Sequence, residues 1–261
     1  MKRLTFAIGL LGLAGVAVSA AAISATDYPH SALQPMPKAL EIRFALSALP
    51  SPLRDGAAVY VLNTTKGYVR ERAGTNGQSC FVSRTEWKFA DYRNDIYDAT
   101  CYDAIGARNH MQVLFDVAAL RAQGVTPDAM KRRIQDGFKT GRYHAPDQSG
   151  FSYMTAPLMR TYMSLNPNDK STVMTMAMPH IMYYAPHVTD SQVGGLGCPP
   201  CAPYPFAFES GPHGYIIQRL GDRETAKIVT DEANLVRELC EYRSLLCLPP
   251  QNPASSVRSS E

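Results

Sequence analysis

Residues 57–62 read Ala-Ala-Val-Tyr-Val-Leu, residues 79–83 read Ser-Cys-Phe-Val-Ser, and residues 100–102 read Thr-Cys-Tyr. β-Branched and aromatic residues dominate these stretches, which is typical of β-strands. A short turn and a return over 68–72 predict a hairpin with the first stretch. We therefore expect 57–103 to form a small antiparallel sheet.

Two of the predicted strands carry a cysteine each. A disulfide between Cys80 and Cys101 would staple these strands and close the polar loop 84–99. The chain holds six cysteines, an even number that favours disulfides in an oxidising compartment. Sequence alone leaves several pairings open. Proximity along the chain suggests two further pairs, Cys198–Cys201 and Cys240–Cys247.

Helical patterns flank and follow this sheet. Residues 37–49 begin with a proline, which suits the first turn of a helix, and continue with an apolar stripe. A second helical pattern ends at Gly124. A third begins at 126–128 (Thr-Pro-Asp), where capping residues gather, and ends at Gly141. The predicted fold class is α+β, with a small antiparallel sheet packed by two or three helices.

The second half of the chain combines strand-like stretches with irregular, proline-rich segments. Further strands are predicted over 151–154, 173–184 and 214–220. The domain organisation that we expect is a signal peptide (1–25), an extended lead-in (26–36), one globular α+β domain (37–221), a C-terminal helix (222–247) and a disordered tail (248–261).

The N-terminus has the composition of a secretory signal. Lys2 and Arg3 form a short positive region, residues 4–18 carry no charge, and small residues that suit cleavage follow up to Ala25. The alternative is an uncleaved anchor, because an apolar run of about 20 residues can span a bilayer. Cleavage would give an exported protein, periplasmic or secreted, with no membrane insertion afterwards.

The net charge gives no reason to expect a polyanionic partner. It is +3 for the whole chain, and loss of Lys2 and Arg3 lowers it to about +1. We therefore expect no nucleic acid partner. Export, the near-neutral charge, the many tyrosines and the lack of familiar catalytic motifs favour a small ligand or an envelope protein as partner, without a cofactor. The sequence contains no Gly-x-Ser-x-Gly elbow, His-Glu-x-x-His motif, phosphate loop or dinucleotide fingerprint.

The Cys-x-x-Cys motif at 198–201 admits redox, metal and structural interpretations. A reactive thiol requires a helix after the first cysteine, and the sequence Ala-Pro-Tyr-Pro at 202–205 prevents one. A zinc site requires a second ligand pair at similar spacing. A c-type haem requires histidine at position 202, where this chain has alanine. We therefore expect a structural disulfide here.

Methionine and histidine alternate along the predicted strand 173–184. These residues fall on even positions, so a continuous strand would place them on one face. Thioether and imidazole groups on one face suit Cu(I). The alternative is that methionine fills an irregular core. The residues concerned are Met174, Met176, Met178, His180 and Met182.

A Pro-His step occurs twice, each time directly before an apolar and aromatic run. The two histidines are His180 and His213. If both runs are strands, both imidazoles lie at the N-terminal ends of strands, where they could face one pocket and bind a metal or act as acid and base. The alternative is that each histidine serves only as a partner for backbone groups. Further candidates for this site are Tyr183, Tyr184, Tyr215, Glu209, His110 and His187.

Several stretches resemble a family of uncharacterised exported bacterial proteins. The stretches are 53–62 (Leu-Arg-Asp-Gly-Ala-Ala-Val-Tyr-Val-Leu), 74–77 (Gly-Thr-Asn-Gly) with Cys80, 101–103 (Cys-Tyr-Asp), 141–142 (Gly-Arg), 152–154 (Ser-Tyr-Met), 179–186 (Pro-His-Ile-Met-Tyr-Tyr-Ala-Pro) and 211–217 (Gly-Pro-His-Gly-Tyr-Ile-Ile). The resemblance implies no activity or substrate. It implies that the chain after 221 is an appendage and that the 198–201 loop is peculiar to this chain.

Two functional hypotheses follow. The first is a non-catalytic binding or envelope-associated protein that is exported. The second is a hydrolytic or metal-assisted enzyme built on His180 and His213. The further candidates in that enzyme are Tyr183 and Tyr215 for catalysis, and Met178 and Met182 as metal ligands.

Overall fold

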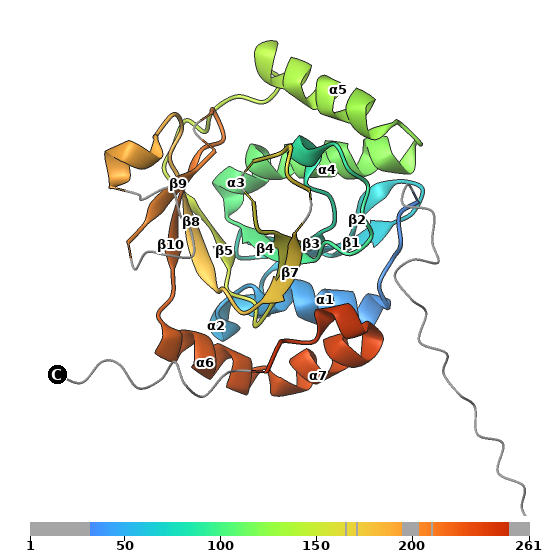
Figure 1. Ribbon diagram of the computed structural model, residues 1–261, viewed down its shortest axis with the longest axis vertical. Coiled ribbons are helices and arrows are strands. Elements are labelled where there is room, and N and C mark those ends of the chain that lie inside the picture. Colours follow the sequence, from blue (N-terminus) through green and yellow to red (C-terminus); the bar gives the residue numbers. More distant parts are fainter. Residues whose placement is uncertain (1–31, 165, 171, 195–203, 210, 251–261) are drawn as a thin grey trace, which may run out of the picture.

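The protein is built on one large mixed β-sheet (Figure 1). The computed structural model describes residues 32–164, 166–170, 172–194, 204–209 and 211–250. Eight strands follow the order β2-β1-β3-β4-β5-β8-β10-β9. Their bounds are β1 Ala58–Asn63, β2 Gly67–Arg72, β3 Ser79–Ser83, β4 Asp98–Tyr102, β5 Phe151–Met154, β8 His180–Tyr184, β9 Phe206–Phe208 and β10 Tyr215–Arg219.

A second, two-stranded antiparallel sheet lies beside the large one. It consists of β6 (Met159–Tyr162) and β7 (Val173–Met176). The backbone of Arg160 pairs with Tyr97, just before β4, and so ties the small sheet to the large one.

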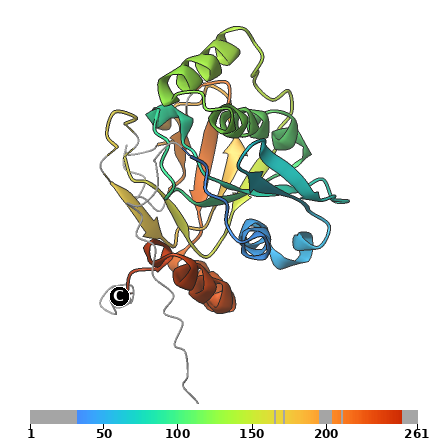
Figure 2. The same ribbon diagram turned by 90° about the vertical axis from the view of Figure 1, so that its right-hand side faces the viewer.

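Helices lie on both faces of the large sheet (Figures 1 and 2). On the α1 face lie α1 (Lys38–Ser47), α2 (Ser51–Arg54), α6 (Asp222–Asp231) and α7 (Ala233–Tyr242). On the α4 face lie α3 (Ala104–Arg108), α4 (His110–Ala122) and α5 (Pro127–Lys139). Three 3₁₀ turns complete the described secondary structure: η1 (Trp87–Phe89), η2 (Asp190–Val193) and η3 (Ser244–Leu246).

Strand alternation explains why both faces are apolar. Successive side chains of a strand point to opposite faces. In β3, Cys80 therefore joins the core under α1, whereas Phe81 joins the core under α4. All residues of β3 and β4 are buried, so these central strands contribute polar side chains (Ser79, Ser83, Asp98 and Thr100) as well as apolar ones to the interior.

The C-terminal helices complete the core of the α1 face. Leu235 and Leu239 of α7 and Leu246 of η3 are buried in the same cluster as Phe44 of α1. The predicted single helix over 222–247 is wrong, because the helix breaks at Glu232 between α6 and α7.

The predicted fold class is also wrong. The large sheet is mixed rather than antiparallel, since β1 and β3 pair in parallel. It is not small either, because β5 joins β4 and carries β8, β10 and β9 into the same sheet. Seven α-helices accompany it in the described part of the chain. Local patterning marks strands but does not specify their partners, so the two halves of this sheet could not be joined from sequence.

The predicted strand over 173–184 is divided between two sheets. Its first part is β7, which pairs with β6, and its second part is β8, which pairs with β5 and β10. The two parts flank Pro179, which has no N–H to donate to a sheet.

The hairpin, several helices and two disulfides are confirmed. β1 pairs with β2 as predicted, and α1, α4 and α5 match their predicted segments. Cys80 and Cys101 are directly opposite each other on β3 and β4 and form a disulfide with Cα atoms 4.1 Å apart. Cys240 and Cys247 form the second one. The signal peptide (1–25), the Cys198–Cys201 pair and residues 251–261 lie outside the described residues.

Candidate functional site

Titratable side chains gather on the α4 face of the sheet. We call this group the acid–tyrosine–histidine cluster. It brings together residues from the η1 segment, β4, the start of α4, and the β9–β10 connection. Its members are Glu86, Lys88, Asp98, Tyr102, His110, Glu209, His213 and Tyr215.

His110 occupies the centre of the aromatic part of the cluster. It is the first residue of α4 and is only 2% exposed. The centroid of its ring lies 4.3 Å from the ring centroid of Tyr184 and 4.7 Å from that of Tyr215. Neither ring nitrogen makes a hydrogen bond of good geometry with a described residue. Burial, reinforced by repulsion from His213, lowers the pKa of His110 to about 3, so the ring is neutral at pH 7.

His213 packs against His110 with its ring tilted, and a backbone carbonyl group holds it in place. Its Nε2 donates to the carbonyl oxygen of His144 over 3.0 Å, and the edge of its ring meets Phe138. Burial lowers the pKa of His213 to about 4. The two adjacent imidazoles are therefore both uncharged at neutral pH, which suits their aromatic surroundings.

Buried tyrosine hydroxyls border the two histidines. The hydroxyls of Tyr102 and Tyr215 lie 3.2 Å apart. The hydroxyl of Tyr184 lies 2.8 Å from the carbonyl oxygen of Phe151 and 3.0 Å from a carboxylate oxygen of Asp103. Burial raises the pKa of all three tyrosines, so each is a neutral hydrogen-bonding group.

Three carboxyl groups form the acidic end of the cluster. Burial raises the pKa of Glu86 to about 7, and the charge of Glu209 adds to this effect. Asp98 is 4% exposed, and burial together with the nearby Glu86 raises its pKa well above the usual range. Asp98 accepts a hydrogen bond from Thr161 of β6, while its Oδ1 has no partner in the described structure.

Lys88 forms an ion pair with Glu209, and its charge also offsets part of the rise in the pKa of Glu86. Its Nζ lies 2.8 Å from Oε1 of Glu209, and both side chains are about one-third exposed or less. Glu209 has a left-handed backbone with φ of 62°, which is unusual for a residue other than glycine. The acidic end thus gathers three carboxyl groups in a poorly solvated place, where burial favours the neutral forms of Glu86 and Asp98.

The structure does not bring His180 and His213 together. β8 and β10 are antiparallel, and His180 pairs with Arg219 at one end of β10. His213 precedes the other end, six residues before Arg219, which corresponds to about 20 Å. His180 is buried, its Nδ1 donates to the carbonyl oxygen of Met178 over 2.8 Å, and burial lowers its pKa to about 4. His180 therefore serves as a partner for a backbone group, which is the alternative given for it in the sequence analysis.

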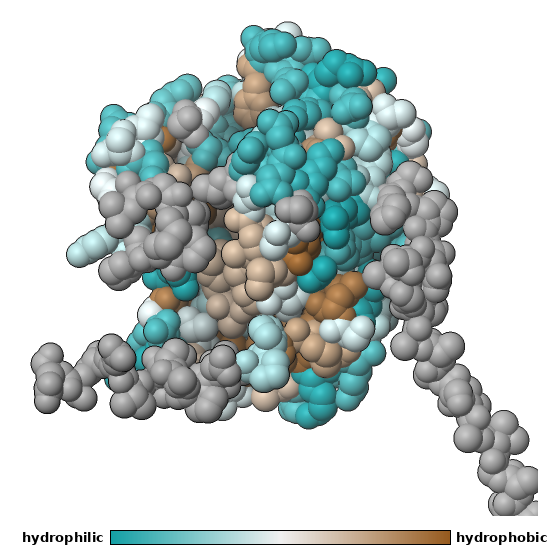
Figure 3. All heavy atoms as spheres, in the orientation of Figure 1, coloured by the Kyte–Doolittle hydropathy of each residue, from teal (hydrophilic) through white to brown (hydrophobic). Residues whose placement is uncertain are grey.

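The predicted companions of these histidines separate in the same way. Tyr215 belongs to the cluster, whereas Tyr183 points to the α1 face and is 44% exposed. Met182 is buried in the α4-face core. Met174 is an exposed residue of β7, in the other sheet. β7 lies at the centre of the view in Figure 1, and the surface at the centre of the same view in Figure 3 is apolar. Within the described residues, no group of three or more His, Cys, Asp or Glu is arranged to hold a metal ion.

Sequence reasoning missed most of the acidic end. Glu86 and Lys88 lie in a segment predicted as a polar loop, and Asp98 precedes the predicted strand. The useful signal was alternation in β4, which places Asp98 on the same face as Tyr102. His110 and Glu209 stood among the further candidates, and both belong to the cluster.

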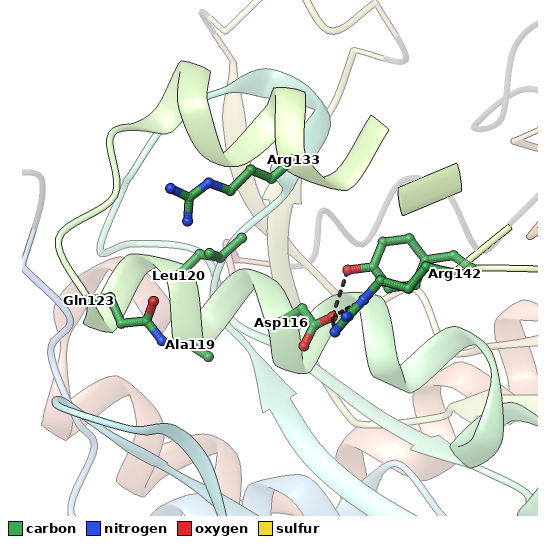
Figure 4. Close-up of a pocket in the computed structure, with 7 residues that line it drawn as sticks. Asp116, Ala119, Leu120, Gln123, Arg133 and Arg142 are labelled. Atoms are coloured by element: carbon green, nitrogen blue, oxygen red, sulfur yellow. Dashed lines mark hydrogen bonds and ion pairs between the residues drawn. The ribbon is translucent and has the colours of Figure 1, made fainter. Parts of the chain in front are cut away.

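A shallow cavity of about 290 Å³ lies between α4 and α5 (Figure 4). Arg133 and Arg142 border it, above a floor that includes Leu120. Asp116 in its wall accepts hydrogen bonds from Arg142 and from the hydroxyl of Tyr143. The carboxylate is thus already satisfied by its neighbours.

No family model matches the sequence, and no curated protein or solved structure is significantly similar to it. The described part of the chain contains no helix that is long and apolar enough to cross a membrane. The resemblance to an exported bacterial family therefore stays a prediction.

Proposed function

We propose that the protein is an exported, non-catalytic binding protein and that its acidic end holds a cationic group of the ligand. The observation that carries this proposal is the position of Asp98 and Glu86. Both carboxyl groups are held where burial opposes their ionisation, and the ion pair of Lys88 goes to Glu209 instead. A cation from outside would stabilise the ionised forms of both groups.

Support for export comes from the N-terminal signal pattern and the cysteines. Residues 1–25 have the charge and hydrophobicity pattern of a cleavable signal. The described part of the chain has two disulfides, Cys80–Cys101 and Cys240–Cys247, and disulfides persist in oxidising compartments.

The arrangement favours an ammonium or guanidinium group as the cation. The three carboxyl groups are not arranged as ligands of one metal ion. An organic cation can instead donate several hydrogen bonds to carboxylates that lie further apart. The neighbouring hydroxyls of Tyr102 and Tyr215 offer further acceptors.

Calorimetric titration tests the proposal. The full exported chain with intact disulfides would be titrated with spermidine, with an arginine-containing dipeptide, and with neutral dipeptides. We expect binding of the cationic probes only, at least tenfold weaker in Glu86→Gln and in Asp98→Asn. Glu224→Gln, on the exposed start of α6, is the matched control and should bind like the unmodified protein.

The pH dependence makes the test sharper. Because the pKa of Glu86 is about 7, this group ionises between pH 6 and pH 8. Cation binding should therefore strengthen as the pH rises over this interval. Absence of binding to every cationic probe, or binding that Glu86→Gln and Asp98→Asn leave unchanged, would contradict the proposal.

A hydrolytic enzyme is the second candidate, and one observation favours it. A carboxyl group with a pKa of about 7 can act as a general acid at neutral pH, and Glu86 has such a pKa beside Glu209. This version of the enzyme hypothesis replaces the pair His180 and His213, which the fold separates. Turnover of an ester or glycoside panel that Glu86→Gln abolishes would establish it over simple binding.

A further inference from the structure

Half of the α1 face of the sheet carries no helix from the described part of the chain. α1 packs against β1, β3 and β4. The strands β8, β10 and β9 lie to one side of α1 (Figure 1). Met182 and Tyr184 of β8 and Tyr215 and Ile217 of β10 point into the α4-face core, so their neighbours along each strand point the other way.

These outward side chains form what we call the open sheet face. All of them are at least partly exposed, and Tyr183 is the most exposed. They come from β5, β8, β9 and β10, which are adjacent strands. The members are Phe151, Tyr153, Ile181, Tyr183, Ala207, Ile216 and Gln218.

Strand register places these residues in two rows. Phe151, Tyr183, Ile216 and Ala207 pair in succession across the four strands. Tyr153, Ile181 and Gln218 form the second row. The rings of Phe151 in the first row and Tyr153 in the second meet edge to face, with ring centroids 5.2 Å apart. Neither row contains a Lys, Arg, Asp or Glu.

The size of the open sheet face argues against a stable dimer as its occupant. Four strands span about 14 Å, and two rows add about 7 Å in the other direction. A stable protein–protein interface buries about 800 Å² on each partner, which is considerably more than this patch provides. A narrow ligand fits the patch better.

The chemistry of the face identifies the class of ligand. Aromatic rings offer flat apolar surfaces for the C–H faces of sugar rings, while the hydroxyls of Tyr153 and Tyr183 and the amide of Gln218 can bond to sugar hydroxyls. A recognition surface that is mostly apolar, with a few polar groups and no charge, suits an uncharged ligand. We infer that the open sheet face binds a neutral glycan chain.

This inference is independent of the acidic end, which lies on the other face of the sheet. Native gel electrophoresis of the full exported chain tests it, in gels that contain dextran, laminarin or hydroxyethyl cellulose. We expect at least one of these neutral glycans to retard the protein. Tyr183→Ala should reduce the retardation at least tenfold, when expressed as the glycan concentration that gives half of the effect.

Met174→Ala is the control, because Met174 is an exposed apolar residue on β7 in the other sheet. It should be retarded like the unmodified protein. Three outcomes would overturn the inference: no retardation in any neutral glycan, equal retardation of Tyr183→Ala, or a dimer in analytical ultracentrifugation that Tyr183→Ala dissociates. Circular dichroism of both variants verifies that each is folded.

Discussion

The imidazole rings of His110 and His213 pack against each other at a tilt, with centroids 4.4 Å apart and ring planes inclined by 33°. One ring belongs to the first turn of α4 and the other to the loop before β10, more than 100 residues later. Protonation of either ring would place a charge against its neighbour inside an aromatic enclosure. The contact therefore depends on both rings being neutral.

Acid should unfold the protein through its buried histidines. The folded pKa values of His110 and His213, about 3 and about 4, lie below the unfolded value of 6.5. The unfolded chain then binds more protons between these limits, so the stability contribution is present above pH 6.5 and is lost as the pH falls towards 3. For each of these histidines, we expect the free energy of unfolding to fall by about 2 kcal/mol between pH 6.5 and pH 4.5, measured by urea unfolding.

His110→Phe isolates this contribution. Phenylalanine keeps the stacked ring and cannot be protonated, so the variant should lose less stability on acidification than the unmodified protein. His187→Asn is the control, because His187 is exposed and its left-handed backbone (φ 63°) tolerates asparagine. An equal loss in His110→Phe and the unmodified protein would refute the assignment.

Glu41 should have the opposite pH dependence. It is 1% exposed and accepts the backbone N–H of Leu62 over 2.9 Å, and burial raises its pKa to about 7. A raised folded pKa gives a contribution that is complete below pH 4.5 and is lost as the pH rises through 7. Glu41→Gln keeps the acceptor and removes the titration. Between pH 5 and pH 8, the Glu41→Gln variant should therefore keep about 2 kcal/mol of the free energy of unfolding that the unmodified protein loses.

Thermal unfolding at several pH values measures this difference, with Glu224→Gln on the exposed surface as the control. The expectation fails if Glu41→Gln and the control respond to pH in the same way.

The two disulfides should contribute unequally to stability. In the chain-entropy description, stabilisation grows with the length of the closed loop. Cys80–Cys101 closes a separation of 21 residues and Cys240–Cys247 one of 7. Replacement of each pair by alanine should cost about 3 and about 2 kcal/mol, respectively, in urea unfolding. A larger loss from the second pair would show that α7 and η3 depend on their bridge for more than loop closure.

Arg121 should hold the η1 segment in place. Its buried guanidinium donates to the carbonyl oxygens of Tyr92 and Arg93 and to side-chain oxygens of Thr85 and Asn94. Arg121→Met leaves several buried acceptors without a donor, so we expect a loss of at least about 3 kcal/mol.

Fluorescence can follow this change locally, because Trp87 is the one tryptophan of the chain and belongs to η1. Arg142→Met is the control: Arg142 pairs with Asp116 on the surface, where an ion pair contributes little to the free energy of unfolding. If Arg121→Met were as stable as this control, the anchoring role would be excluded.

Short-range features were predictable because they depend on neighbours along the chain. Alternation and a turn defined the β1–β2 hairpin, and Pro127 with Gly141 delimited α5. The Cys80–Cys101 bridge followed from two cysteines on strands that are close in sequence. The acid–tyrosine–histidine cluster was only partly predictable, because Glu86, Asp98 and His213 come from three distant segments.

The sequence by itself determined the position of the β1–β2 hairpin and of α1, α4 and α5, and which side chains share a face of each strand. Those properties depend on backbone preferences within a few residues. Only the tertiary structure decided which strands pair and in which direction, because that choice depends on burial between distant segments. The antiparallel pairing of β8 and β10 placed His180 and His213 at opposite ends, whereas the packing of α4 against the sheet brought His110 onto His213.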